Sequence, residues 1–173
     1  MGTETIEIVE REAVPTLEIS VRTTILWMPK RIGQSYGRLA QYIEAHQGEF
    51  SGVPYVRYLE IDWNALMRER RLFAFFKMFT RSWNLRVGFP LKQALDGEGE
   101  VRSAAFPAGQ YLQTLHTGPY ENLNDAYNRL YAFAKEKGLT LKPECIEEYL
   151  NDPDVVGKEA LETRVLVPVE TQA

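Results

Sequence analysis

Cysteine is nearly absent from this sequence, since Cys145 is the only one among 173 residues. A single cysteine excludes an internal disulfide framework and is typical of a reducing compartment. Histidine is almost as scarce, and His46 and His116 lie far from Cys145 and from each other, so no zinc-type ligand spacing occurs. We therefore expect a cytoplasmic protein that holds no metal.

Long apolar runs, basic runs and nucleotide-binding motifs are missing too. No apolar stretch approaches the roughly 20 residues of a membrane-spanning helix, and the first residues include Glu4 and Glu7 where a signal peptide is basic. The net charge of −4 comes without a segment rich in Lys and Arg. Glycine-rich phosphate loops and Gly-x-Ser-x-Gly elbows are also absent. We expect no membrane contact, no direct nucleic-acid binding and no cofactor.

The first half of the chain has the pattern of strands around one helix. Residues 5–26 alternate apolar and polar side chains, which predicts strands with a break or strand edge at Pro15. A helix is expected over residues 29–46, because its apolar residues form one stripe. A loop containing glycine and proline then leads to a strand at 55–61.

The second half has the same order of elements. A strand is expected at 111–117, a helix at 121–137, a strand at 144–150 and a last strand at 161–169. Gly138 is placed to end the helix, and Asn-Asp-Pro at 151–153 is typical of a turn.

Short matches show that the two halves are copies of one unit. The matching pairs are residues 36–39 with 127–130, Tyr58 with Tyr149, and residues 86–90 with 164–168. Repeats this short rarely bury a core alone, so the two should pack as a pseudo-symmetric pair. We predict an α+β fold in which each repeat is strand–helix–strand–strand.

The predicted boundaries follow from these matches. Repeat one covers about residues 5–95 and repeat two about 100–170, within a single domain of residues 1–173. The first copy carries an insertion at about residues 64–83. Its apolar stripe suits an amphipathic helix and consists of Leu72, Phe75, Phe76, Phe79 and Trp83. This helix could pack on the body, form a wall or lid over a cleft, or serve as a basic surface for a partner.

The strand at 144–150 carries the candidate site. Alternation places Cys145, Glu147 and Tyr149 on one face, and Ile146 and Leu150 on the other, where we expect the helices to pack. A carboxylate on a partly closed face needs a partner, so Glu147 would favour a cationic or hydrogen-bond-donating ligand. An ordinary solvated glutamate is the alternative.

The repeat makes this glutamate unusual, because the first copy has Val56 at the position of Glu147. One half brings a carboxylate and the other only an apolar wall, which points to a site at the junction. Aromatic residues gather near it, each of which could instead belong to the core: Tyr58, Trp63, Phe89, Tyr111, Tyr120 and Tyr149. Trp83 or Phe76 of the insertion is expected to touch the cleft. We interpret Cys145 as an inert lining thiol, and His116 as a structural hydrogen bonder.

Residues 116–120 (His-Thr-Gly-Pro-Tyr), the segment from Glu147 to Pro153 and the closing strand at 162–169 together resemble the GyrI-like small-molecule-binding family. That family includes effector-binding domains of AraC-type and MerR-type multidrug regulators and the DNA gyrase inhibitory protein. The resemblance implies an antiparallel sheet, helices on its convex side and a ligand cleft at the centre. It also implies that Glu147 is the central acid of an aromatic pocket, with Tyr149 beside it. Because neither end of the sequence carries a DNA-reading segment, we expect a stand-alone version.

Three hypotheses follow for the function. The first is binding of small apolar, often cationic aromatic compounds, with Glu147 as counter-charge, for sensing or sequestration. The second, implied by the resemblance, is a hydrolase that opens cyclopropane-bearing genotoxic compounds, with Glu147 activating water and Tyr149, Tyr111 or a tryptophan donating a hydrogen bond. The third is inhibition of DNA gyrase, by family analogy alone. The sequence leaves the oligomeric state open.

Overall fold

The computed structural model describes residues 5–68 and 81–170. Its elements, in chain order, are β1 (Ile6–Arg11), β2 (Val14–Thr23), α1 (Met28–Ala45), β3 (Tyr55–Leu59), α2 (Trp63–Arg68), β4 (Trp83–Pro90), β5 (Val101–Phe106), β6 (Gly109–Thr117), η1 (Tyr120–Asn122), α4 (Leu123–Lys137), β7 (Glu144–Tyr149), η2 (Lys158–Ala160) and β8 (Glu162–Pro168). No helix in these residues is both apolar enough and long enough to span a bilayer.

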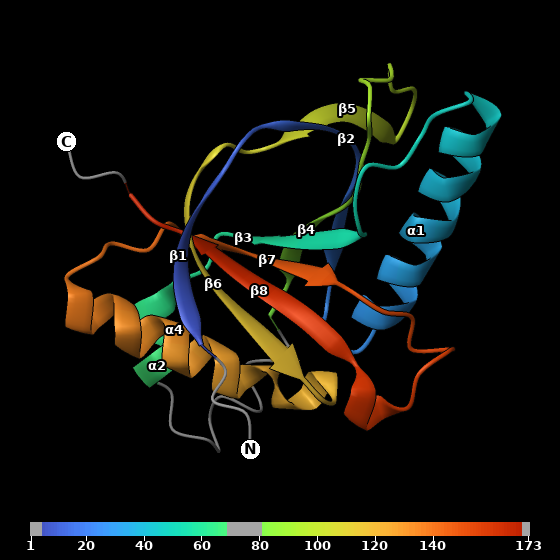
Figure 1. Ribbon diagram of the computed structural model, residues 1–173. Helices are drawn as coiled ribbons and strands as arrows, with labels where there is room; N and C mark the ends of the chain where they lie inside the picture. The colour runs from blue at the N-terminus through green and yellow to red at the C-terminus, as the bar shows by residue number, and fades with distance from the viewer. Residues whose placement is uncertain (1–4, 69–80, 171–173) are drawn as a thin grey trace.

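One antiparallel sheet runs through the molecule in the order β1-β6-β8-β7-β3-β4-β2-β5. This order is symmetric about the β7–β3 pair, as expected for two related repeats. The α+β class and the paired repeats predicted from the sequence are confirmed. Figure 1 shows the sheet strongly curved, with α1 and α4 well separated from each other.

Each repeat begins with a strand that pairs in the other half. β1 pairs with β6 of the second repeat, and β5 pairs with β2 of the first. β5 was not expected from the sequence, because its residues Val101–Phe106 do not alternate cleanly. The chain breaks between β1 and β2 before Val14. Pro15 is the second residue of β2, opposite Ala105, so the strand begins one residue before the position at which a break or strand edge was expected.

The helices cover one face of the sheet in two clusters. α1 packs Leu39 and Ile43 onto Val56 and Val87 of the first half. α4 does the same in the second half with Leu130 and its neighbours, against Leu112, Val165 and Val167. A third cluster, of Tyr55, Phe106, Tyr111, Ile146 and Leu166, lies on the opposite face. The helices therefore leave the centre of their face to other side chains.

Only the two ends of the insertion lie in the described residues. α2 ends the described helical part at Arg68, and residues 69–80, including Phe76, lie outside the described residues. Trp83 is the first residue of β4, opposite Thr23 of β2, and is therefore not part of a helical stripe. The helical spacing of aromatic residues extended into a segment that pairs as a strand, because sheet pairing overrides local pattern.

One glycine leaves room for a buried tyrosine ring of the neighbouring strand, which gives a stability prediction. A Cβ on Gly88 would lie 2.5 Å from Cζ of Tyr55, a fully buried ring whose hydroxyl donates to Glu18 at 2.7 Å. We expect Gly88→Ala to lower the free energy of unfolding by about 1–3 kcal/mol through overpacking.

The matched control is Gly37→Ala in α1, where an added Cβ would meet nothing within 4 Å. That change should raise the free energy of unfolding by roughly 0.5–1 kcal/mol, because alanine favours a helix. Urea denaturation of both variants measures the two effects, and a neutral Gly88→Ala would contradict the packing described.

Candidate functional site

Glu147 lies at the centre of the molecule, on β7 directly opposite Val56 of β3. These are the two positions that the repeat makes equivalent, so the pseudo-twofold axis passes between them. Because α1 packs over one half of the sheet and α4 over the other, the sheet surface around Glu147 and Val56 lies between the two helices. Val56 is fully buried and Glu147 is only 5% exposed, so a carboxylate faces an apolar wall as the sequence suggested.

The face on which Glu147 lies was predicted wrongly. Cys145 packs in the cluster under α4, Tyr149 packs against the cluster under α1, and Ile146 lies in the cluster on the other face. The strand alternates as expected, but the helix side is that of Glu147. Apolar Ile146 has a second core available on the far side of the curved sheet, which the sequence did not reveal.

Three tyrosine hydroxyls hold the carboxylate of Glu147. Tyr149 donates to Oε2 at 2.7 Å, and Tyr58 donates to the same oxygen at 3.1 Å. Tyr127, from α4, donates to Oε1. Charge-assisted hydrogen bonds of this kind are stronger than neutral ones, and they keep a carboxylate fixed away from water. The carboxylate is therefore held in one position at the centre of the site.

Burial is the strongest influence on the ionisation of this group. Desolvation raises the pKa of Glu147, and the hydrogen bonds from Tyr127, Tyr149 and Tyr58, with the charge of His116, oppose the rise. Burial also raises the pKa of all three tyrosines, and the nearby carboxylate adds to it. The hydroxyls therefore stay protonated as donors, while the carboxylate resists ionisation.

Two other buried glutamates show by contrast what Glu147 lacks. Glu148 accepts Arg11 at 2.7 Å and Arg164 at 2.6 Å. Glu18 forms ion pairs with two further arginines, Arg57 and Arg86. Within residues 5–68 and 81–170, no arginine or lysine forms an ion pair with Glu147. Its negative charge is therefore hydrogen-bonded but is not neutralised by a basic side chain.

Aromatic rings surround this carboxylate on several sides. Their contacts, given as distances between ring centroids, are Tyr120 with Tyr149 at 5.6 Å, Tyr58 with Trp83 at 6.3 Å, Trp63 with Tyr127 at 6.2 Å and Tyr36 with Phe89 at 5.2 Å. Tyr120 is 37% exposed, so aromatic surface reaches from solvent to within one ring of Glu147. Trp63 is more remote, because Tyr127 separates it from the acid.

Tyr111 does not join this group. It packs with Ile146 and Phe106 on the opposite face of the sheet, and its hydroxyl donates to the carbonyl of Pro107 at 2.6 Å. Its neighbour in the chain, Leu112, is the one that faces the helices. The prediction that Tyr111 lines the site or donates to a substrate there is wrong, because it chose the wrong face of β6.

Cys145 and His116 have the surroundings expected of them. Cys145 is 2% exposed, and burial, with Glu147 second, raises the pKa of its thiol. The thiol donates to the hydroxyl of Tyr127 at 3.5 Å. Nε2 of His116 lies 3.1 Å from the carbonyl oxygen of Pro119, just before the 3₁₀ turn. Both residues support the site without offering a nucleophile.

Sequence reasoning missed Tyr36 and Tyr127, which it assigned to the apolar stripes of the two helices. They are equivalent in the repeat and lie on α1 and α4. A tyrosine at the same place in both stripes was the available signal, because a buried hydroxyl requires a partner. Tyr127 finds it in Glu147, whereas the hydroxyl of Tyr36 has no hydrogen-bond partner among the described residues.

Two further polar atoms on this face are also without a partner in the described part of the chain. They are Nε1 of Trp83 and Oγ1 of Thr163, which lies opposite Tyr149 in the sheet. Buried polar atoms are nearly always hydrogen-bonded in native proteins, so such atoms indicate a place for water or a ligand.

A hollow of about 410 Å³ lies between α2 and the end of α4. Trp63, Asn64, Tyr131 and Lys135 line it, and a second hollow lies beside α1. Neither reaches Glu147, so the central cleft stays a prediction.

Comparison with known proteins gives a family and a set of similar folds. The model of the GyrI-like small molecule binding domain matches residues 73–170. A search of curated proteins gave no match.

Among solved structures, the chain is similar to the C-terminal domain of EcmrR, with 16% identity, 99% of this chain and 100% of that chain covered, and a TM-score of 0.72. A hydrolase from Listeria innocua encoded by lin2189 has 12% identity, coverage of 96% and 92%, and a TM-score of 0.66. SAV2435 bound to tetraphenylphosphonium has 9% identity, coverage of 96% and 94%, and a TM-score of 0.59. At these identities the likeness establishes the fold.

Proposed function

The chain belongs to the GyrI-like small-molecule-binding family, and from that premise we propose that it binds flat or bulky aromatic cations at Glu147. The observation that carries the proposal is a buried carboxylate at the repeat junction, held by three tyrosine hydroxyls and by no arginine or lysine of the described residues. Sequestration or sensing of such compounds would be the biological role.

The charge of Glu147 supplies the selectivity for cations. A buried anion gains most from a ligand of opposite charge, because the low-dielectric surroundings screen the attraction weakly. The tyrosine donors keep the carboxylate in place before a ligand arrives, so little ordering is needed on binding. The arginine-paired Glu18 and Glu148 offer no such attraction, since their charge is already matched.

The rings supply the affinity for apolar surface. Tyr36, Tyr58, Tyr149 and Phe89 all pack against the cluster between α1 and the sheet, and aromatic faces attract cations. Tyr120 is partly exposed, so a ligand would reach Glu147 from solvent by displacing the Tyr120 ring from its edge contact with Tyr149. The unpartnered hydroxyl of Tyr36 offers a ligand a hydrogen bond from the α1 side.

A pH titration of binding tests this proposal. The pKa of Glu147 is raised by burial, and the cation prefers the ionised carboxylate. Affinity for tetraphenylphosphonium should therefore fall as the pH drops below that pKa, toward the weaker affinity of the neutral side chain, and level off above the pKa. Calorimetry between pH 5 and pH 8 measures the profile, with triphenylphosphine oxide as a neutral ligand whose affinity should stay flat.

Glu147→Gln is the control for the origin of this pH dependence, because glutamine cannot ionise. The variant should bind tetraphenylphosphonium with an affinity that does not change with pH. A slope that persists in the variant would assign the titration to another group and would contradict the proposal.

Hydrolysis remains the second prediction, with the raised pKa of Glu147 in its favour, since a more basic carboxylate is a better general base. Tyr149 could donate to a substrate oxygen, whereas Tyr111 lies on the other face. Mass spectrometry of a cyclopropane-bearing compound incubated with wild type and Glu147→Gln decides, and product no faster than in buffer leaves binding alone. No feature of the described residues favours gyrase inhibition.

A further inference from the structure

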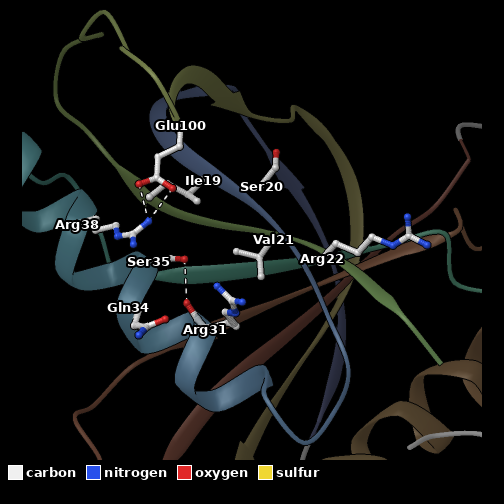
Figure 2. A pocket seen from close by; sticks show the side chains of 9 residues that line it. All are labelled: Ile19, Ser20, Val21, Arg22, Arg31, Gln34, Ser35, Arg38 and Glu100. Atoms are coloured by element: carbon white, nitrogen blue, oxygen red, sulfur yellow. Dashed lines mark hydrogen bonds and ion pairs between the residues drawn. The ribbon is translucent and has the colours of Figure 1, made fainter. Parts of the chain in front are cut away.

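A second hollow, remote from Glu147, lies between α1 and the free end of β2. Its volume is about 180 Å³, and Figure 2 shows the side chains around it. Basic and neutral polar groups dominate the lining, with one acid at the rim: Ile19, Ser20, Val21, Arg22, Arg31, Gln34, Ser35, Arg38 and Glu100. The composition is unlike that of the aromatic site, and it points to a ligand of the opposite charge.

Helix α1 directs its polar face to this hollow. Arg31, Ser35 and Arg38 are spaced by four and three residues, so they lie along one side of the helix. The hydroxyl of Ser35 donates its hydrogen to the carbonyl oxygen of Arg31 at 2.9 Å, so it has no hydrogen left to donate to a ligand. Arg31 and Arg38 both line the hollow, and their Cα atoms are about 10 Å apart along the helix axis.

The two guanidinium groups differ in their present partners. Arg38 donates to both oxygens of Glu100, at 2.6 and 2.7 Å, in a pair whose side chains are 58% and 53% exposed. Solvent screens such a pair strongly, so another oxyanion can compete for the same guanidinium. Arg31 has no carboxylate partner within the described residues. The third arginine, Arg22, points away in Figure 2 and donates to Ser82 at 3.0 Å.

The backbone of β2 adds donors on the other side of the hollow. β5 begins at Val101, opposite Ile19, so residues 20–23 pair with β4 on one side and with no described strand on the other. Alternate backbone groups along that open edge face outward, and Ser20, Val21 and Arg22 line the hollow. Backbone N–H groups are good ligands for oxyanions, as in other anion-binding concavities.

We propose that this hollow binds a small polyanion, a molecule with two or more phosphate or carboxylate groups. One group would pair with Arg31 and a second with Arg38, displacing Glu100, because a guanidinium binds carboxylates and phosphates in a bidentate manner. The volume admits a compact metabolite rather than a polymer. The site shares no residue with the Glu147 site, so it does not depend on the function proposed above.

Titration of the full chain with pyrophosphate and with citrate, in a buffer poor in anions, tests this proposal. Calorimetry should show saturable binding of at least one of them, and the tighter one identifies the group as phosphate or carboxylate. Arg31→Ala and Arg38→Ala should each weaken that binding at least tenfold. Glu100→Gln should strengthen it severalfold, since Arg38 loses its competitor.

Glu98→Gln is the matched control, because it removes the same charge from an exposed residue two positions away that does not line the hollow. It should leave the affinity within about twofold, and amide shifts in NMR spectra of the wild type should map to residues 20–22. The proposal is overturned if neither polyanion saturates, if inorganic phosphate or acetate binds as tightly, or if Glu98→Gln matches Glu100→Gln. Circular dichroism establishes that each variant is folded.

Discussion

A Glu147→Gln variant is expected to bind tetraphenylphosphonium roughly 30-fold more weakly than the wild type at neutral pH, which corresponds to about 2 kcal/mol. Glutamine keeps the size of the side chain, and its carbonyl oxygen can still accept the hydrogen bonds that the hydroxyls of Tyr58 and Tyr149 donate. The change therefore removes charge and leaves the shape of the site. Binding of triphenylphosphine oxide, which has no charge, should change less than twofold.

The measurement is a pair of calorimetric titrations on each protein, with Glu162→Gln as the control. Glu162 is exposed on β8, so its replacement lowers the net negative charge equally without touching the site. Comparable losses for the cationic and the neutral ligand would remove the counter-charge role of Glu147 and reduce the site to an apolar surface. A loss in Glu162→Gln as large as in Glu147→Gln would assign the effect to long-range attraction.

The sequence was sufficient to predict the elements that depend on local pattern. The stripes of α1 and α4 and the equivalence of Tyr58 with Tyr149 came from spacing alone, and the sheet places Val56 opposite Glu147. An internal repeat helps such predictions, because a position that differs between the two copies stands out against the positions that match. A valine in one copy against a glutamate in the other singled out the central position before any contact was known.

The choice of face could not be made in the same way. Alternation says which residues of β7 share a side, but not which side the helices cover, and here both sides are buried. Ile146 was a reasonable residue to place under a helix; the curvature of the sheet, with β1 and β5 exchanged between halves, creates a second core for it. Long-range pairing decides such cases, and Tyr127 was missed for the same reason.

The contribution of a buried glutamate to the stability of the protein should depend on its partners. We expect Glu148→Gln to destabilise the protein more than Glu147→Gln does. The carboxylate of Glu148 is 5% exposed and holds Arg11 and Arg164, whose side chains are 32% and 33% exposed. Glu148→Gln leaves both guanidinium groups without their counter-charge, at a cost on the order of 3 kcal/mol. For a chain of this length that lowers the melting temperature by roughly 6–12 °C.

Glu147→Gln should behave in the opposite way. Folding raises the pKa of Glu147, so ionisation favours the unfolded state as pH rises. Below the ordinary range of a glutamate, about 4.3, both proteins carry a neutral side chain and should be equally stable. As pH rises through the raised pKa the wild type loses stability relative to the variant, and above it the difference stays constant.

Thermal unfolding of both variants between pH 4 and pH 8 separates the two kinds of glutamate. A Glu147→Gln variant that is destabilised at neutral pH as much as Glu148→Gln would mean that the tyrosines stabilise the ionised carboxylate fully, which contradicts a raised pKa. If instead the variant gains stability, the wild type keeps a charge that weakens its own fold. A bound cation would relieve that cost, so the stability given up at Glu147 contributes to the affinity of the site.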